Sequence, residues 1–384
     1  MTQTKLTKTD KRIWLPAIAA VFLLSCQPGT GKKQLPEVVA TEKMQEIYEE
    51  VKTPFKYGLI LVPDSNSHKF DCPTVFRHDN KWLMTYIVFD GKGYETCLAE
   101  SDDLLNWERK GRLLSYSGSA DWDVNQKAGY PALIDYRWES GYAIHRYGGN
   151  YWMSYLGGDT QGYEKGLLSA GIAFTKQDPG LVHEWQRLDK PVLSSADPDA
   201  RWYDNSVIYK SFIIEDHDRL TGHPFVMFYN ARGDSLNPGR GAERISMAVS
   251  DDLLNWKRFG NQPVINHHKG ISGDAVFQKI GDVYVMFYFG AFWPGEKAKA
   301  FDTFACSYDL VNWTEWNGPH LIEPSEPYDG LFAHKPWVLK QDGVVYHFYN
   351  AVDTLGNRGI ALATSKDLGK SSLKFNSVTE SEVK

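Results

Sequence analysis

The chain has 384 residues, of which 42% are hydrophobic and 14% aromatic, so it can bury a large core in one big domain or two small ones. Its net charge of −6 is not offset by a basic region, which argues against a nucleic-acid partner. The 13 Trp and 21 Tyr residues suit both packing in β-sheets and stacking on sugar rings.

The first 26 residues have the pattern of an export signal. Basic residues precede an apolar run, Trp14–Leu24, that is too short to span a membrane as a helix. The run ends in the letters LLSC, with the small Ser25 directly before Cys26, which is typical of a bacterial lipoprotein signal. We therefore expect Cys26 to carry a lipid that anchors the protein at the cell envelope, on the periplasmic side or the outer surface. A plain signal peptide is the alternative.

Residues 27–56 follow as a tether and a short helix. The stretch QPGTGKK suits a flexible tether, and TEKMQEIYEEVK has the period of a helix. Beyond it lie three cysteines, Cys72, Cys97 and Cys306, an odd number that predicts no disulfide framework. A single bridge between Cys72 and Cys97 and three buried thiols both remain open.

Residues 57–370 repeat one pattern five times. Each copy has two short runs of alternating apolar residues, a third strand, a turn and a fourth strand. The turn is SDDLLNW at Ser101–Trp107 and again at Ser250–Trp256, and SYDLVNW at Ser307–Trp313. We interpret its Asp-Leu pair as structural, with the aspartate turning the chain and the apolar side chains packing between units.

Four-stranded antiparallel meanders repeated around an axis form a β-propeller. We therefore predict an all-β, five-bladed β-propeller over residues 57–370, followed by a C-terminal tail at 371–384. The five copies are Cys72–Gly111, Tyr130–Leu188, Tyr203–Gly260, Asp274–Trp316 and His334–Leu368. Separate sandwich domains are the competing fold, but no linker divides the repeats.

Residues at the start of the five inner strands should ring one central pocket. They are Asp71, Tyr130, Asp204, Asp274 and His334. An aspartate here can also cap a turn, but three carboxylates and an imidazole at matching positions favour a site. Carboxylates that face each other across a funnel suit glycoside hydrolysis, one as the base on water and one as the acid. Positions on different blades leave room for that water, which favours inversion.

Two motifs at these positions, FDCPTVF at Phe70–Phe76 and YDNSVIY at Tyr203–Tyr209, resemble those of the five-bladed β-propeller glycoside hydrolases. The resemblance is above all to family 43, with relatives in families 32, 117 and 130. It implies Asp71 as the base and Asp204 as a carboxylate that tunes its neighbours' pKa values. Where the family has Glu-Gly-Pro at the start of blade four, this chain has Ser272-Gly273-Asp274.

This departure leaves three candidates for the general acid: Asp274, two positions on, then Glu243, which enters a third strand on the same face, and then His334. Family 117 enzymes are associated with a histidine near the site. His334 could instead bind a structural cation in the channel, as a family 43 histidine can. No cofactor is required by this chemistry, and no cluster of metal ligands predicts a catalytic metal.

Loops on the same face offer further side chains for binding sugar. They are Trp122, Asp123, Trp202, Trp293, Lys335 and Arg358, together with Tyr130 at the second inner strand. Tryptophans in loops could stack on sugar faces, although packing in the core is an equal alternative for each. Lys335 could bind the carboxylate of an anionic sugar or a sulfate, or could merely be solvated.

These features predict an exo-acting, inverting glycoside hydrolase that releases a terminal sugar from plant or algal oligosaccharides and polysaccharides. A phosphorylase, as in family 130, is the first alternative, but only Lys335 and Arg358 are placed to bind phosphate. The second is a glycan-binding lipoprotein that has lost its acid, which the departure at Ser272 favours. We expect membrane contact only through the lipid anchor.

Overall fold

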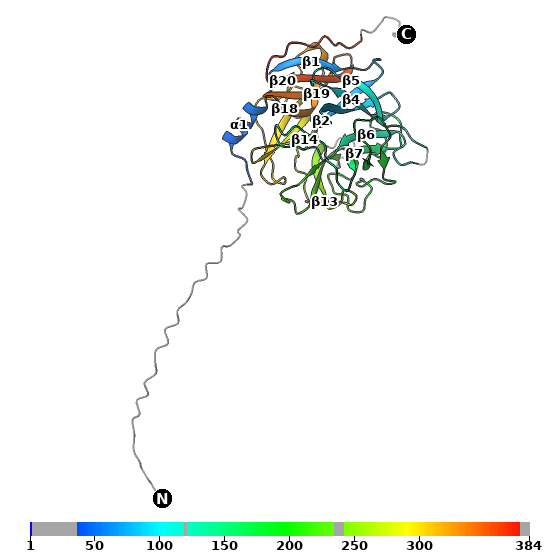
Figure 1. Ribbon diagram of the computed structural model, residues 1–384. Helices are drawn as coiled ribbons and strands as arrows, with labels where there is room; N and C mark the ends of the chain where they lie inside the picture. Colours follow the sequence, from blue (N-terminus) through cyan, green and yellow to red (C-terminus); the bar gives the residue numbers. More distant parts are fainter. Residues whose placement is uncertain (2–36, 119–120, 234–241, 377–384) are drawn as a thin grey trace. The chain divides into compact units, whose positions relative to one another are not determined.

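The computed structural model describes Met1 and residues 37–118, 121–233 and 242–376. These residues form β-strands, the helix α1 (Thr41–Val51) and the single 3-10 turn η1 (Pro327–Asp329), shown in Figure 1. The all-β class and the short helix predicted from the sequence are therefore confirmed. The expected lipidation at Cys26 falls outside the described residues.

The strands form antiparallel meanders that join into three sheets. The first sheet contains β2 (Lys69–His78), β3 (Lys81–Phe89), β4 (Tyr94–Ser101), β5 (Glu108–Leu114), β6 (Gln126–Pro131), β7 (Tyr151–Gly158), β8 (Ser169–Thr175) and β9 (Gln186–Arg187). The second contains β10 (Val207–Glu215), β11 (Phe225–Arg232), β12 (Glu243–Ser250), β13 (Trp256–Phe259), β14 (Ile271–Ile280), β15 (Val283–Ala291), β16 (Ala300–Ser307) and β17 (Thr314–Glu315). The third contains β18 (Phe332–Gln341), β19 (Val344–Val352), β20 (Arg358–Thr364) and β1 (Phe55–Leu61).

Single parallel contacts connect the meanders inside the two larger sheets. Tyr94 pairs with Gln126 between β4 and β6, and Glu243 pairs with Ile271 between β12 and β14. The structure thus groups the strands into sheets of eight, eight and four. The all-β meander is established, and the count of five separate blades stays a prediction.

The first and last parts of the domain share one sheet. Strand β1 runs antiparallel to β20, with Phe55 opposite Thr364 and Leu61 opposite Ile360. The meander β18–β19–β20 therefore receives its fourth strand from the beginning of the domain. This strand starts inside the segment 27–56 that the sequence assigns to the tether and helix.

The repeated turn is structural, as its sequence predicts. In the copy at 101–107, Asp103 Oδ1 accepts hydrogen bonds from the backbone N–H groups of Leu105 and Asn106. Trp107 Nε1 donates to the carbonyl oxygen of Leu104 at 3.0 Å. The copies at 250–256 and 307–313 repeat these bonds. The side chain thus replaces the ladder partners that the backbone loses where the chain turns.

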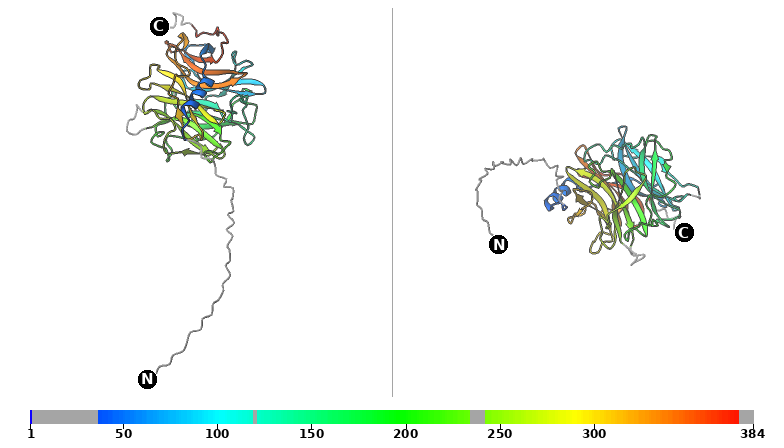
Figure 2. Two further views of the ribbon diagram at one scale, coloured as in Figure 1. Left: turned by 90° about the vertical axis from the view of Figure 1, so that its left-hand side faces the viewer. Right: turned by 90° about the horizontal axis from the view of Figure 1, so that it is seen from below.

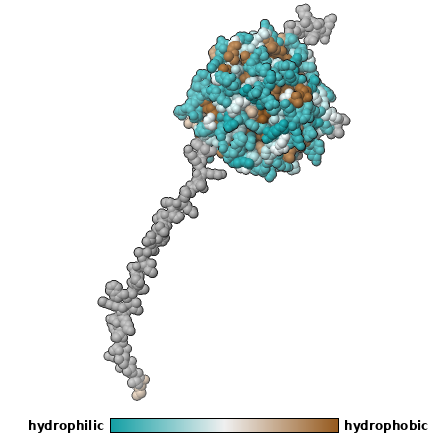
Figure 3. Space-filling model, in the orientation of Figure 1, coloured by the Kyte–Doolittle hydropathy of each residue, from teal (hydrophilic) through white to brown (hydrophobic). Residues whose placement is uncertain are grey.

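Helix α1 packs on the outside of the sheets, as Figure 2 shows. Its residues Met44, Ile47 and Val51 are buried, and Tyr48 stacks on Trp316 with ring centroids 5.0 Å apart. A search of the described residues finds no helix that is long and apolar enough to cross a membrane. The face in Figure 3 is mostly hydrophilic, with apolar patches scattered over it.

Candidate active site

A pocket of about 220 Å³ lies where the first strands of the meanders converge. Strands β2, β6, β10, β14 and β18 all contribute side chains to its wall. Seven of the residues expected from the sequence line it: Asp71, Tyr130, Glu243, Asp274, His334, Lys335 and Arg358. The argument from the direction of the strands therefore locates the pocket correctly.

Bulges in the first strands shape the pocket wall. The antiparallel register shifts between Asp71 and Thr74 in β2, and at matching places in β10, β14 and β18. Three residues at these bulges, Cys72, Asp274 and Lys335, have φ angles of 51°, 56° and 66°. Residues other than glycine rarely adopt positive φ angles, and such strain gathers at functional sites. The bulges thus re-aim side chains that an unbroken ladder would place elsewhere.

Asp71 is a buried carboxylate with both oxygens occupied. Its Oδ2 accepts hydrogen bonds from Lys335 Nζ at 3.1 Å and from Arg358 Nη1 at 2.5 Å. Its Oδ1 accepts one from the backbone N–H of Cys72 at 3.0 Å. Burial on its own would raise the pKa of Asp71, but the charges of Lys335 and Arg358 outweigh burial and hold this pKa well below its usual range. Asp71 is therefore ionised and holds two cations in place.

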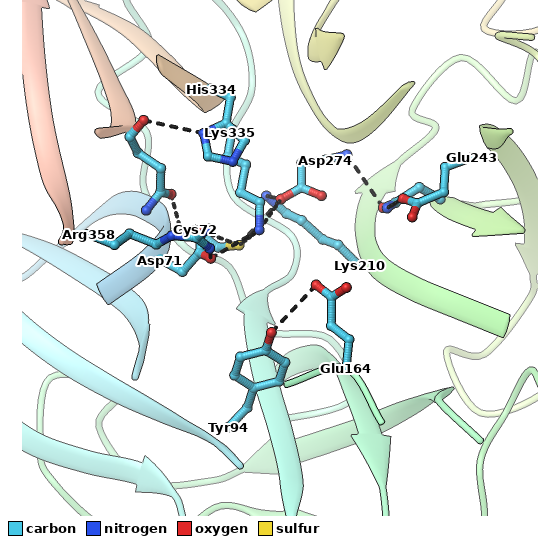
Figure 4. Close-up of polar contacts among 12 residues, drawn as sticks. Asp71, Cys72, Tyr94, Glu164, Lys210, Glu243, Asp274, His334, Lys335 and Arg358 are labelled. Atoms are coloured by element: carbon cyan, nitrogen blue, oxygen red, sulfur yellow. Dashed lines mark hydrogen bonds and ion pairs between the residues drawn. The ribbon is translucent and has the colours of Figure 1, made fainter. Parts of the chain in front are cut away.

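Asp274 lies next to this group, with the thiol of Cys72 between the two aspartates (Figure 4). Its Oδ2 is 3.3 Å from Cys72 Sγ, 3.9 Å from Lys210 Nζ and 4.0 Å from Lys335 Nζ. Burial raises the pKa of the Cys72 thiol, and the charge of Asp71 raises it further. The sulfur therefore stays protonated and donates a weak hydrogen bond to Asp274.

Two glutamates, Glu243 and Glu164, face the pocket away from the Asp71 group, as Figure 4 shows. Asn230 Nδ2 donates to Glu243 Oε2, and the hydroxyl of Tyr94 donates to Glu164 Oε1, both over a long 3.5 Å. Burial raises the pKa of Glu243 to about 8, with a further contribution from the charge of Glu164. Burial also raises the pKa of Glu164. The glutamates are thus the pocket carboxyl groups that retain protons most strongly.

His334 also lines the pocket but is uncharged. The side chain is 6% exposed, and its ring lies edge-on to Phe289 with centroids 5.3 Å apart. Burial lowers the pKa of His334 well below its usual range, and the nearby charges of Lys335 and Arg358 lower it further. A neutral imidazole has no acidic proton of the strength that a general acid needs at neutral pH.

The structure does not bring Asp204 to the pocket wall, contrary to the expectation from its motif. Asp204 lies before β10, where its Oδ2 accepts hydrogen bonds from the Tyr229 hydroxyl at 2.7 Å and from Arg258 Nε at 2.6 Å. The bulge of β10 falls between Ile208 and Ser211, so Ile208 is the counterpart of Asp71. The motif comparison that equates Asp204 with Asp71 is therefore displaced by four residues.

Asp123 is bound in the same way outside the pocket wall. Its carboxylate accepts hydrogen bonds from the Tyr155 hydroxyl at 2.7 Å and from Arg187 Nη1 at 2.6 Å, and Trp122 stacks on the ring of Tyr155. A third aspartate, Asp329, is bound by Tyr349 and Lys56. We call the three residues the clamp aspartates: Asp123, Asp204 and Asp329, each three residues before a first strand.

Two further tryptophans expected at the site pack elsewhere. Trp202 is 40% exposed, and the guanidinium carbon of Arg244 lies 4.9 Å from its ring centroid. Trp293 stacks on His267 at 3.5 Å and donates its Nε1–H to the carbonyl oxygen of Ile271. Neither indole lines the pocket, because neighbouring side chains or backbone groups already take up these rings.

The sequence analysis missed Glu164, Lys210 and Cys72 as pocket residues. Glu164 lies in the loop between β7 and β8, the second and third strands of a meander. The same strand-direction argument that selects Glu243 also applies to this loop, so the signal for Glu164 was present. Lys210 and Cys72 lie at bulges, whose register the alternating pattern does not reveal.

Comparison with solved structures finds two relatives that match almost over their full length. One is named "Glycoside hydrolase", and the other is described as a complex of BT0996 with RGII. Each has 52% sequence identity and a TM-score of 0.86, over 88% of this chain and 99% of the other. Scans against protein-family models and against curated protein sequences gave no match.

More distant structures share the fold. A thermostable family-43 glycoside hydrolase matches with 16% identity and a TM-score of 0.56, over 81% of this chain and 95% of its own. Structures described as members of families 130 and 32 match with 13% and 12% identity. The resemblance stated from the sequence motifs is thus confirmed at the level of fold.

Proposed function

Because this chain belongs to the glycoside hydrolases, as the relative with 52% identity over 88% of its length shows, we propose that it is an exo-acting enzyme that releases a terminal sugar. One relative is described as a complex with RGII, so fragments of RGII are the first substrates to test. Other plant and algal polysaccharide fragments form the wider class. Each four-stranded meander would be one of five blades around the pocket.

The pocket supports action at chain ends. Its volume is about 220 Å³, and the bonds from Lys335 and Arg358 to Asp71 link β18 and β20 to β2 across it. A site of this size holds the end of a glycan, whereas cleavage within a chain needs an open groove.

A single observation carries the proposed chemistry: Glu243 is a pocket carboxyl group with a pKa of about 8. At neutral pH it holds a proton, which it can donate to the oxygen of the departing sugar. Sequence analysis ranks Glu243 second among the candidate acids. Its protonation supports moving it ahead of Asp274, and ahead of the neutral His334.

We propose Glu164 as the partner carboxylate that activates water or attacks the sugar. The sequence assigns the base to Asp71, but both oxygens of Asp71 are occupied and its pKa is held very low, which makes it a weak base. Glu164 makes only a long contact with Tyr94, and its raised pKa makes it the stronger base. Two coupled carboxyl groups with one proton between them suit this division of roles.

The two alternatives have less support. A phosphorylase must offer cations to phosphate, but Lys335 and Arg358 are both bound to Asp71. A glycan-binding protein without activity has no need of two carboxyl groups whose pKa values are raised inside its pocket. Inversion stays our expectation, because Glu164 and Glu243 stand on separate meanders with room for water between them.

An activity screen tests this function. The protein is incubated with fragments of RGII, arabinan, xylan, galactan and algal polysaccharides, with and without phosphate, and released monosaccharide is measured. We expect release without phosphate, and proton NMR of the first product should show the inverted anomer. Turnover that requires phosphate would replace hydrolysis by phosphorolysis, and binding without turnover on any substrate would favour the glycan-binding alternative.

We further propose that the enzyme is lipid-anchored through Cys26 at the bacterial cell envelope. Labelling of cells with a fatty-acid analogue should mark the wild type and not Cys26→Ala. A structural cation near His334 is a separate proposal. Extended chelation should then lower the unfolding temperature without abolishing turnover.

A further inference from the structure

Lys210 is a buried cation whose hydrogen-bonding capacity is unused. The residue is 4% exposed and lines the pocket, and its Nζ has no hydrogen-bond partner among the described residues. Its ammonium group lies 4.8 Å from the ring centroid of Tyr130 and 3.9 Å from Asp274 Oδ2. A buried charged donor without a partner costs more than the roughly 1–3 kcal/mol of a neutral one. A ligand that accepts a hydrogen bond from Lys210 would remove this cost.

Asp274 is the complementary acceptor. Its Oδ2 lies 3.9 Å from Lys210 Nζ and 4.0 Å from Lys335 Nζ, and both distances exceed that of a direct hydrogen bond. The thiol of Cys72 approaches the same oxygen at 3.3 Å, but a thiol is a weak donor. Lys210 and Asp274 therefore face each other with space for one more polar atom (Figure 4).

A hydroxyl group is the ligand that satisfies both residues. An ammonium group only donates hydrogen bonds and an ionised carboxylate only accepts them, whereas a hydroxyl does both. An oxygen between Lys210 and Asp274 would accept from the first and donate to the second. A carboxylate or sulfate in this place would satisfy Lys210 but would lie against the negative charge of Asp274.

The charge balance of the pocket points the same way. Lys335 and Arg358 are committed to Asp71, so Lys210 is the lining cation that remains, and Asp274 stands beside it. Glu164 and Glu243 add further acidic groups. The described residues thus leave no surplus positive charge for an anionic sugar.

We propose that Lys210 and Asp274 form a hydroxyl-reading pair that selects an uncharged terminal sugar. This deepens the proposed function and rests on it. The ion pair of Lys335 with Asp71 then positions the pocket wall, in place of the anion binding that the sequence suggests for Lys335.

Lys210→Met tests the pair, because methionine keeps an unbranched apolar side chain and removes the three donors. Binding is measured on the full-length protein by saturation-transfer NMR, with arabinose, xylose, galactose, glucose, rhamnose and fucose as neutral probes. Galacturonate and glucuronate serve as anionic probes. We expect neutral sugar to bind, and Lys210→Met to weaken the tightest of these by about tenfold to a hundredfold, the value of a hydrogen bond to a charged group.

A matched control is Lys127→Met, since Lys127 is also buried but donates to Ser117 outside the pocket wall. Its sugar affinity should match that of the wild type. Deoxy analogues of the bound sugar locate the hydroxyl group: one analogue should bind wild type and Lys210→Met equally well. Lys210→Met should also unfold at the same temperature as the wild type or higher, because it removes a buried unpaired charge.

Three results would overturn the pair: tighter binding of the uronates than of every neutral sugar, unchanged affinity in Lys210→Met, or no binding of any neutral probe. A marked fall in the unfolding temperature of Lys210→Met would make Lys210 structural instead. Binding needs no turnover, so a protein that binds neutral sugar through Lys210 but cleaves nothing would sink the proposed hydrolysis and keep this subsite.

Discussion

The clamp aspartates and the pocket glutamates are buried acids of the same fold with opposite surroundings. Asp123, Asp204 and Asp329 are fully buried, and each accepts a tyrosine hydroxyl and pairs with a cation from another strand. Glu164 and Glu243 have long 3.5 Å contacts and raised pKa values. A carboxylate whose hydrogen bonds are complete holds strands together, and one whose bonds are incomplete is available for chemistry.

The largest effect should come from removing a pocket glutamate. Glu164→Gln leaves water or the sugar without its base, so kcat should fall by about 10²–10⁴-fold on natural and activated aryl substrates alike. Circular dichroism and the unfolding temperature should stay at wild-type values, since Glu164 makes no strong bond. If Asp71→Asn has this signature and Glu164→Gln does not, the base is Asp71.

Glu243→Gln should separate the two kinds of substrate. A sugar leaving group needs the proton of Glu243, so the loss on natural linkages should again reach about 10²–10⁴-fold. A nitrophenolate leaves without a proton, and activity on a nitrophenyl glycoside should largely survive. The matched variants Asp274→Asn and His334→Ala test the other candidate acids. The acid role moves to whichever of them shows the split in place of Glu243→Gln.

The pKa of Glu243 predicts a pH dependence for activity and for stability. The wild-type kcat/KM should fall as the pH rises through about 8, where Glu243 loses its proton, and Glu243→Gln should lack this limb. The folded-state pKa is raised above the unfolded value, so this proton stabilises the fold at low pH and ceases to do so as pH rises through about 8. The free energy of unfolding of the wild type, measured against Glu243→Gln, should therefore decline between pH 5 and 8. Parallel curves for the two proteins would contradict the raised pKa.

A clamp aspartate should show the reverse of this behaviour. Asp204→Asn leaves Arg258 buried without its charge partner, which costs about 3–5 kcal/mol in the free energy of unfolding. The kcat of the protein that remains folded should be close to wild type, because Asp204 does not line the pocket. Urea unfolding and active-site titration measure the two quantities separately. A shifted pH profile with unchanged stability would instead restore Asp204 as the tuner that its motif implies.

The smallest effect should come from the repeated turn. Asp103→Ala removes the bonds to the N–H groups of Leu105 and Asn106 at an exposed site, at a cost of about 1 kcal/mol. Asp252→Ala should cost the same, since its bonds are the same. Kinetic constants should not change in either variant. Unequal losses of stability would show that the two copies of the motif have different surroundings.

The sequence predicts the elements of this molecule better than their register. Alternating apolar runs and the SDDLLNW turns identify the meanders, and the direction of the strands leads to the pocket. The error at Asp204 arises because local letters match FDCPTVF while the bulge of β10 lies at Tyr209 and Lys210. A bulge depends on cross-strand pairing, which a single strand does not encode.

Roles within the pocket were harder to predict than its location. Asp71 and Glu243 are both acids near strand ends, and the alternating pattern treats them alike. Their pKa values diverge because Lys335 and Arg358, more than 260 residues away in sequence, reach Asp71 and not Glu243. Such charge environments follow from the tertiary structure, so the acid and the base could not be told apart from the motifs alone.

The pairing of β1 with β20 also constrains how the protein is made. Strand β1 is synthesised first, yet its partner β20 follows only after some 300 residues of chain. The closing sheet therefore forms last, after a loop closure of very high contact order. Until then β1 is an unpaired strand edge open to pairing with other chains. A nascent or secreted chain of this protein thus depends on its final hundred residues before its first strand is protected.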